Sequence, residues 1–184
     1  FAEVSKASDI NTSSQSGFNG GIFFEAPTKK FLGFRSELSY SKQGYNYKTS
    51  ENTGNVNLDY FLQTQLLTLN FTKLVQLHAG FQTAFLLNAT VDSIKTGGTP
   101  TTMDVMDLYN KFDYGFAFGG EVHPFKGLLV GARYNLSLAK LYKDLSTLQA
   151  PSFTSEDAKN NVFMIYAGWK FGGFKPKEGS APGM

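Results

Sequence analysis

The sequence has no cysteine, little charge and no long hydrophobic run. Without cysteine the chain forms no disulfide scaffold, no cysteine-ligated metal site and no thiol catalyst. The net charge of +2 is too small for a protein that binds nucleic acid through bulk electrostatic attraction, so we expect no nucleic-acid partner. The longest apolar run, residues 162–167, is far shorter than the roughly 20 residues of a transmembrane helix, which excludes such a helix.

Aromatic residues, in contrast, are abundant. The 184 residues include 18 Phe, 9 Tyr and 1 Trp, and only 17% are charged, against about 25% in a typical globular domain. Glycines interrupt the apolar stretches, where a helix tolerates them poorly. This composition leaves open a membrane protein that crosses the bilayer with strands.

Apolar and polar residues alternate with period two through most of the chain. In residues 112–122, aromatic and aliphatic side chains occupy one parity and mainly small or acidic residues the other, which predicts a strand with one apolar and one polar face. Most predicted strands are about twice as long as the five or six residues usual in soluble proteins. The pattern predicts strands at residues 18–26, 31–44, 59–71, 75–89, 111–124, 128–139 and 161–171.

The alternation alone does not show which face lies outside. A polar face of Gly, Ser, Asn, Arg and Glu suits the interior of a narrow barrel, and a uniform aromatic-rich face suits lipid, whereas a soluble barrel has the reverse arrangement. Connector lengths favour the membrane, because short periplasmic turns and long extracellular loops are typical of outer-membrane barrels. The short connectors are 28–30, 72–74 and 124–127, and the long ones are 45–56, 90–110 and 140–160.

Aromatic residues gather at the ends of the predicted strands, as the interfacial girdles of a membrane barrel require. The last strand ends in the sequence YAGWKF at 166–171, which resembles the C-terminal signal by which outer-membrane barrels are recognised for insertion. We therefore predict the bacterial outer membrane as the location. The predicted interfacial aromatic residues are Phe31, Tyr40, Phe71, Phe125, Trp169 and Phe171.

These features predict an all-β fold, an eight-stranded antiparallel up-and-down transmembrane β-barrel over residues 1–171. Bacterial single-chain barrels have an even number of strands, so we place the remaining strand at residues 1–4 and expect a polar loop to residue 16. On this account the chain starts partway along its first strand, and a few residues precede Phe1 in the natural protein. Residues 172–184 are expected to be a flexible tail or linker. Side chains just fill the interior of an eight-stranded barrel, which argues against a diffusion pore.

Four segments lie in order along the chain: GFNGGIFFE at 17–25, RSELSYSKQG at 35–44, KFDYGFAFGG at 111–120 and VGARYNLSL at 130–138. Together they resemble the PorT-type outer-membrane β-barrel family of Bacteroidota, with an OmpA-like eight-stranded barrel. The resemblance implies an outer-membrane barrel. Most members are uncharacterised, and the namesake serves type IX protein secretion. The strand predicted at 59–71 departs from the family's pattern. In the family a Glu and a Pro commonly follow the Tyr of this strand, whereas this chain reads YFLQTQ at 60–65.

Charged residues on the predicted inner face are the first candidates for a functional site. Unpaired charges inside a narrow barrel are costly, so these side chains must pair. One interpretation is a polar network that stabilises the barrel, and the other is a gated path for ions or protons. His78 and His123 have no metal-ligand partner at a recognisable spacing, so we predict neither a metal site nor a cofactor. The predicted network comprises Arg35, Glu37, Asp113, Glu121, Arg133 and Lys170, with Glu25 as a further candidate.

The same residues argue against an enzyme. Small outer-membrane barrels include lipid A acyltransferases and deacylases, which place His, Ser and an acidic residue near the extracellular rim. Here His78 points inward from the middle of the barrel, His123 lies on the periplasmic side, and no Gly-x-Ser-x-Gly motif is present. We predict that the protein is not an enzyme.

Two glutamines interrupt the outer face of the strand predicted at 59–71. Parity with Phe61 and Leu67 places the amides of Gln63 and Gln65 toward lipid, where an unbonded amide costs free energy. Either a bulge or a slip returns them to the inside, or the strand docks on a neighbouring protein. We take the second alternative as the candidate interface with a helper subunit.

The leading functional hypothesis is a structural or accessory subunit of a larger cell-envelope complex, in secretion or outer-membrane protein assembly. Its partners would be outer-membrane lipid and other outer-membrane proteins. The alternative is a stand-alone barrel whose loops bind an extracellular ligand or surface. Residues 103–110 are compatible with a short helical turn packed over the mouth, either as a structural lid or as a ligand-recognition element. A tail leading to a peptidoglycan-binding domain would indicate a cell-wall tether instead.

Overall fold

The computed structural model describes residues 2–5, 11–26, 31–48, 52–95, 99, 101–143 and 158–171, and the predicted tail at 172–184 lies outside these ranges. Within them, no helix has the length and hydropathy to cross a membrane. The elements are β1 (Ala2–Ser5), β2 (Asn11–Ser14), β3 (Phe18–Glu25), β4 (Leu32–Lys48), β5 (Asn52–Asn70), β6 (Val75–Lys95), β7 (Thr101–Asp104), the 3₁₀ helix η1 (Met106–Leu108), β8 (Phe112–Phe125), β9 (Leu128–Ser137) and β10 (Lys159–Trp169).

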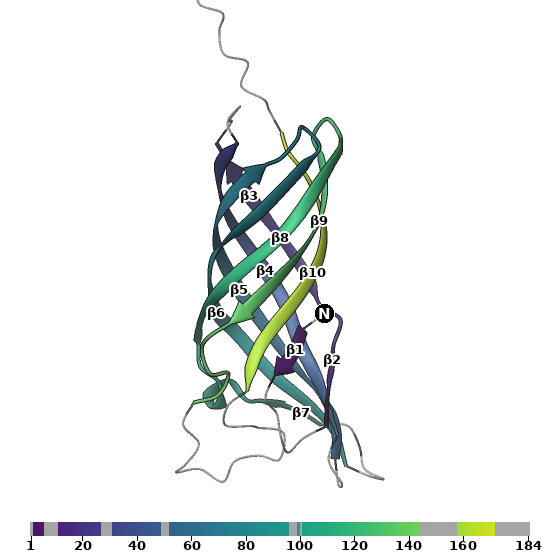
Figure 1. Ribbon diagram of the computed structural model, residues 1–184. Helices are drawn as coiled ribbons and strands as arrows, with labels where there is room; N and C mark the ends of the chain where they lie inside the picture. The colour runs from purple at the N-terminus through teal and green to yellow at the C-terminus, as the bar shows by residue number, and fades with distance from the viewer. Residues whose placement is uncertain are drawn as a thin grey trace, which may run out of the picture.

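The strands form one antiparallel sheet that curls into a tall, narrow cylinder (Figure 1). Its neighbour order is β1-β10-β9-β8-β6-β5-β4-β2, and β3 and β7 pair with β4 and β6. The long strands follow one another as up-and-down neighbours, which confirms the predicted fold class. The turn between β8 and β9 needs a glycine, because Gly127 has a φ of 95°, a conformation that residues with a Cβ rarely adopt.

The central strands are longer than the sequence pattern predicts. The stretch 45–56 is not a long loop, because β4 continues to Lys48 and β5 begins at Asn52. The stretch 90–110 likewise contains the end of β6, the strand β7 and the helix η1. In these extensions the inward side chains are apolar, as at Val56, and the outward ones are polar, as at Asn55. The apolar side chains thus switch from the outward to the inward face of the strand, and in the sequence this switch resembles the end of a strand.

The N-terminal strands complete only part of the cylinder. β1 pairs with the loop-side end of β10, where Ala2 lies opposite Val162. The expected loop before residue 16 is wrong in part, because β2 pairs with the end of β4. Among the described residues, no ladder joins β3 to residues 163–169 of β10. A cavity of about 480 Å³ lies along this seam, lined in part by Gly20, Gly21 and Trp169.

The interior changes character along the barrel axis. Next to the short turns, buried side chains such as Arg35, Gln76 and Glu121 are polar or charged, and we call this part the polar half. Toward the long loops, the buried side chains form one apolar cluster, and we call this part the apolar half. Its members are Tyr45, Tyr47, Val56, Leu58, Tyr60, Leu62, Ala84, Leu86, Ala89, Val91, Val105, Tyr109, Leu141, Tyr142 and Ala158.

Tyrosines from the loops close the loop-side mouth. Tyr109 and Tyr142 form a bridge between two loop segments, and the hydroxyl of Tyr45 from β4 hydrogen-bonds both phenols. Met106 of η1 packs against the same cluster, as the predicted cover over the mouth requires, whereas Met103 is exposed. The interior is therefore filled at this end.

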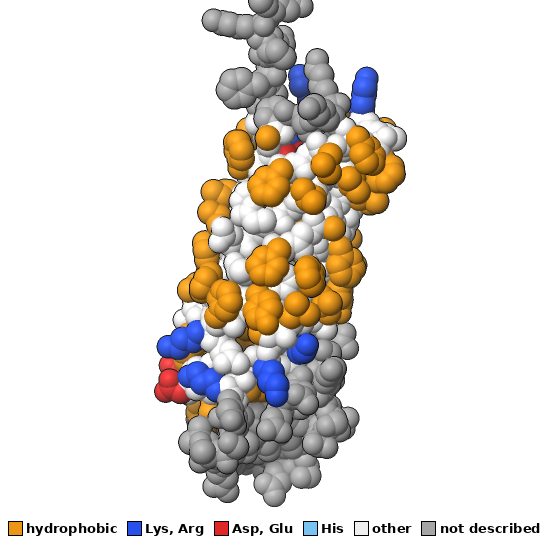
Figure 2. All heavy atoms as spheres, turned by 60° about the vertical axis from the view of Figure 1, so that its left-hand side comes forward, with side chains coloured by type: hydrophobic (Ala, Val, Ile, Leu, Met, Phe, Trp, Pro, Cys, Tyr) orange, Lys and Arg blue, Asp and Glu red, His pale blue; other side chains and the backbone are white. Residues whose placement is uncertain are grey.

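A hydrophobic band surrounds the polar half on the outside (Figure 2). On β4 it extends from Leu32 to Tyr40, in agreement with the roughly nine to eleven residues with which a tilted strand crosses a bilayer. Its loop-side edge is a row of aromatic residues paired across four strands. This row is Tyr40, Phe61, Phe85 and Phe112. The next row begins with Lys42, Asp59 and Asn88, so the outer surface becomes polar within two residues.

Candidate functional site

Arg35 occupies the centre of the polar half. It lies on the inward face of β4, and its side chain is 1% exposed. Its Nε and Nη2 donate to Oε2 of Glu25 at 2.8 and 2.6 Å. Its Nη1 and Nη2 donate to the two carboxylate oxygens of Glu121 at 2.8 and 2.6 Å, and Nη2 also donates to Oε1 of Gln76 at 2.7 Å. The buried guanidinium therefore has two carboxylates and an amide around it, which offsets much of its desolvation.

Arg133 forms a second ion pair deeper in the barrel. Its Nη1 and Nη2 donate to both oxygens of Glu37 at 2.6 and 2.8 Å, a two-pronged geometry. Its Nε donates to Nε2 of His78 at 3.2 Å, and its guanidinium carbon lies 5.3 Å from the ring centre of Tyr166. Arg35 is 3.7 Å from Glu37, so the two ion pairs form one network.

The network continues to the short-turn rim through two further basic side chains. Nζ of Lys170 lies 3.0 Å from Glu25, and Nε2 of His123 lies 2.9 Å from Glu121. The hydroxyl of Tyr166 also donates to Glu121 at 2.9 Å. Three permanent cations, Arg35, Arg133 and Lys170, thus face three carboxylates, Glu25, Glu37 and Glu121.

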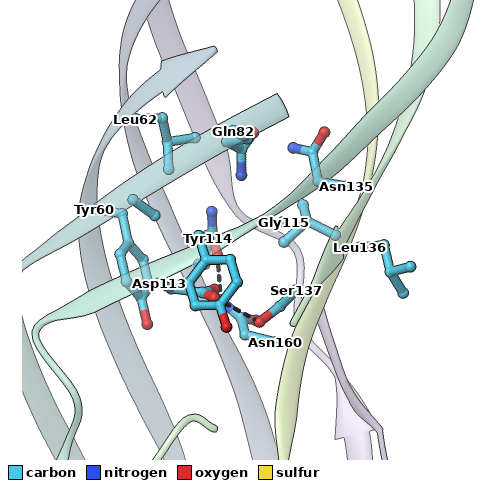
Figure 3. A pocket seen from close by; sticks show the side chains of 13 residues that line it. Tyr60, Leu62, Gln82, Asp113, Tyr114, Gly115, Asn135, Leu136, Ser137 and Asn160 are labelled. Carbon is cyan, nitrogen blue, oxygen red and sulfur yellow. Dashed lines mark hydrogen bonds between the residues drawn. The ribbon is translucent and has the colours of Figure 1, made fainter. Parts of the chain in front are cut away.

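Asp113 lies apart from this network, in a polar layer that borders the apolar half (Figure 3). Its Oδ1 accepts a hydrogen bond from Oγ of Ser137 at 2.8 Å, and Nδ2 of Asn160 donates to Oε1 of Gln43 at 2.5 Å. A cavity of about 10 Å³ lies between these side chains, and the side-chain amide of Asn135 has no partner among the described residues. A space of this size holds no more than about one water molecule, so the layer has no room for a substrate.

The predicted inner-face residues therefore fall into two groups. The structure brings five of the six together, with Glu25 as their sixth member, and leaves Asp113 with a different set of neighbours. Sequence reasoning missed four further side chains of the network, although their inward parity was visible and only their pairing was not. They are Gln76, His78 as a hydrogen-bond acceptor, His123 and Tyr166.

Chemically, the network is saturated with its own charges. Each carboxylate accepts from a guanidinium, and Arg35, Arg133 and Glu121 are at most 5% exposed. Within the described part of the chain, no group of His, Cys, Asp and Glu side chains is arranged to hold a metal ion. This geometry is that of a polar core.

Gln63 and Gln65 lie on the outer surface of the hydrophobic band. They share the outward face of β5 with Phe61 and Leu67, and the bulge between β5 and β6 falls at residues 59 and 60, so it leaves both amides outward. Nε2 of Gln65 donates to Oγ of Ser36 on β4 at 2.9 Å. Gln63 is paired across the sheet with Leu38 and Thr83. We call Ser36, Gln63, Gln65 and Thr83 the polar strip.

The predicted interfacial aromatic residues all lie exposed at the two edges of the band. Most gather at the short-turn edge, where the rings of Phe31 and Phe71 meet edge to face at 5.5 Å. The short-turn edge carries Phe31, Phe71, Phe125, Trp169 and Phe171, and the loop-side edge carries Tyr40.

Comparison with known proteins gives one match. A family model described as an outer membrane protein beta-barrel domain matches residues 2–143, which is more than half of the chain. No curated protein and no solved structure matches the chain.

Proposed function

The chain belongs to the outer membrane protein β-barrel domain family and is located in the bacterial outer membrane, and we propose that it is a non-enzymatic structural or accessory subunit of a larger cell-envelope complex. The complex would act in protein secretion or in outer-membrane protein assembly. Besides the outer-membrane lipid around the band, the partners would be other outer-membrane proteins that contact β4, β5 and β6.

The polar strip is the observation that carries this proposal. It lies at the middle of the band, because Ser36 is halfway between Leu32 and Tyr40 on β4 and is paired with Gln65 on β5. Hydrocarbon offers no hydrogen-bond partner, so an amide in contact with acyl chains costs free energy. Among the described residues, one side-chain hydrogen bond joins members of the strip, from Gln65 to Ser36. The amide of Gln63 would be satisfied by a polar side chain of a neighbouring protein.

The interior of the barrel supports the same proposal. The polar half contains the ion-pair network, and the apolar half is closed by Tyr45, Tyr109 and Tyr142. The cavity of about 480 Å³ at the seam, which Arg35 and Arg133 help to line, therefore does not continue as an open path through the mouth, and such a barrel is suited to presenting its outer surface and its loops. We assign the function accordingly to the outside of the barrel.

Within the family, we propose that the chain belongs with the PorT-type barrels of Bacteroidota. The four ordered segments at 17–25, 35–44, 111–120 and 130–138 support this placement. The departure at 60–65 falls on the strand that carries Gln63 and Gln65. The proposed interface would therefore be a feature of this chain rather than one shared across that group.

Site-specific photocrosslinking in native membranes tests the proposal. A photoreactive residue at position 63 is expected to capture a protein, because the partner covers the polar strip. The matched control is position 130, since Val130 is likewise exposed, points outward from β9 and lies three strands away from β5. Capture of lipid alone at both positions would falsify the subunit assignment.

A further inference from the structure

Lysines gather at the loop-side edge of the hydrophobic band. Figure 2 shows basic side chains along the border where the band ends. Three exposed lysines belong to two neighbouring segments: Lys111 directly precedes Phe112 of the aromatic row, and Lys140 and Lys143 follow β9.

Backbone hydrogen bonds hold these two segments together. The amide of Lys143 donates to the carbonyl of Leu108 at 3.0 Å, and the amide of Asn110 donates to the carbonyl of Leu141 at 3.0 Å. Nδ2 of Asn110 also donates to the carbonyls of Lys140 and Tyr142, each at 2.8 Å. The three lysines therefore extend from one tied piece of backbone.

Aromatic residues of the outer surface follow Lys111 along the chain, on the side toward the short turns. The rings of Phe85 and Phe112 are 5.1 Å apart, and those of Phe112 and Tyr114 are stacked at 6.3 Å. Aromatic rings at the end of a lipid-facing band mark the level of the lipid headgroups. Lysine side chains placed just beyond that level extend into the headgroup layer.

Within the described segments 106–111 and 140–143, three lysines outnumber one acidic side chain, Asp107. Asp107 of η1 is exposed, and Nζ of Lys143 donates to its backbone carbonyl at 2.9 Å. Lys111 makes no ion pair with any residue in the ranges that the structure describes. Long loops mark the extracellular side of an outer-membrane barrel, so the area faces the outer leaflet. The anionic groups at that level are the phosphates of lipid A.

We propose that Lys111, Lys140 and Lys143 form a binding site for a phosphate group of lipid A in the outer leaflet, with the acyl chains lying on Phe85, Phe112 and Tyr114. The site lies on the β8–β9 side of the barrel. Its acyl-chain contacts border the polar strip, because Tyr114 is paired with Thr83 of that strip. The site is argued from the lysines and the aromatic rings and does not depend on the subunit assignment.

Native mass spectrometry of the detergent-solubilised full chain, titrated with bisphosphorylated lipid A, tests this site. Each basic side chain near a lipid headgroup contributes about 1 kcal/mol, so Lys111→Gln is expected to weaken binding about fivefold. The matched control is Lys48→Gln, which removes an equally exposed lysine at the same end, far beyond the aromatic row on β4. This control should bind lipid A as the parent protein does.

The phosphate requirement is checked with lipid A from which both phosphates have been removed. The parent protein should bind this probe more weakly than Lys111→Gln binds the intact lipid, because the contacts of all three lysines are lost, and inorganic phosphate alone should not displace the lipid. Equal affinity of the parent protein and Lys111→Gln would overturn the site, and so would equal affinity for the two lipids, since acyl contacts alone would then explain binding. Unfolding curves for both variants confirm that each barrel is intact.

Discussion

The two halves of the barrel have opposite arrangements of polar and apolar side chains. In the polar half, buried side chains such as Arg35 are charged and outward ones such as Phe34 are apolar. In the apolar half, buried side chains such as Leu58 are apolar and outward ones such as Asn57 are polar. The same strands, β4, β5 and β6, run through both halves. Each half is arranged for its own surroundings: lipid requires an apolar outside, and water allows a polar one.

The difference also shows which force holds each half together. In the apolar half, burial of Tyr45, Leu58 and their neighbours uses the hydrophobic effect, as in a soluble barrel. In the polar half the outside is already in lipid, so burial of apolar surface from water contributes less, and paired charges fill the interior instead. Three substitutions separate these contributions, in order of decreasing effect.

The largest effect is expected from Arg35→Met. It leaves the carboxylates of Glu25 and Glu121 buried without their main partner, and breaking a buried ion pair from one side costs about 3–5 kcal/mol. Urea unfolding of the barrel in lipid vesicles measures this loss. The double variant Arg35→Met, Glu121→Gln should recover part of the stability, because one of the two uncompensated charges is gone. An unchanged unfolding free energy for Arg35→Met would show that the network does not stabilise the polar half.

The second-largest effect is expected from a lysine placed on the outer surface, because its cost in unfolding free energy should differ between the two halves. Phe81→Lys puts a charge at the middle of the band, which is expected to cost about 2–4 kcal/mol. The control Asn55→Lys places the same charge on the outward face of β5 in the apolar half, where about 0.5 kcal/mol or less is expected. Both are measured by unfolding in vesicles. Equal costs at the two positions would contradict the assignment of lipid to one half and water to the other.

The smallest effect concerns alkaline pH and the loop tyrosines. Burial raises the pKa of Tyr109 well above its ordinary value near 10, and burial also raises the pKa of Tyr142. The folded state therefore keeps these protons more tightly than the unfolded state. This contribution to stability is complete below the ordinary tyrosine pKa and is lost as the pH rises through the raised pKa of the folded protein.

Unfolding measured across that alkaline range should show a decline in stability for the parent protein and a shallower one for Tyr109→Phe. The titration of the phenols, followed by ultraviolet absorbance, gives an independent readout. If Tyr109→Phe declined as steeply as the parent protein, the closed mouth would not depend on the protonated phenol.

The sequence predicts the membrane-embedded half of the fold well, because outward residues there are apolar at most positions outside the polar strip. On β4 they run from Leu32 to Tyr40, and the same parity places Gln63 and Gln65 outward on β5. The apolar half was missed for a physical reason. Its apolar residues, such as Tyr45 and Val56, face inward, so the pattern reverses where lipid ends and the outward Asn and Thr residues resemble a loop.

The candidate site was predictable as a set of inward positions but not as a set of contacts. Parity assigned Arg35, Arg133 and Asp113 to the same face without giving their heights along the axis. Those heights depend on the stagger between strands, which pairs Arg133 with Gly119 on β8 and separates it from Asp113. The role of His78 as an acceptor for Arg133 depends on the same stagger.

The most direct test of the two-halves account is a spin-label scan along the outward face of β5, which passes through both halves. Nitroxides at positions 55, 57, 61 and 67 are examined in bilayers for collision with oxygen, which is enriched in lipid, and with a water-soluble nickel chelate. The account predicts that oxygen dominates at 61 and 67 and that the nickel chelate dominates at 55 and 57. Nickel accessibility at 61 and 67 equal to that at 55 would contradict it, because the band would then not be in contact with lipid.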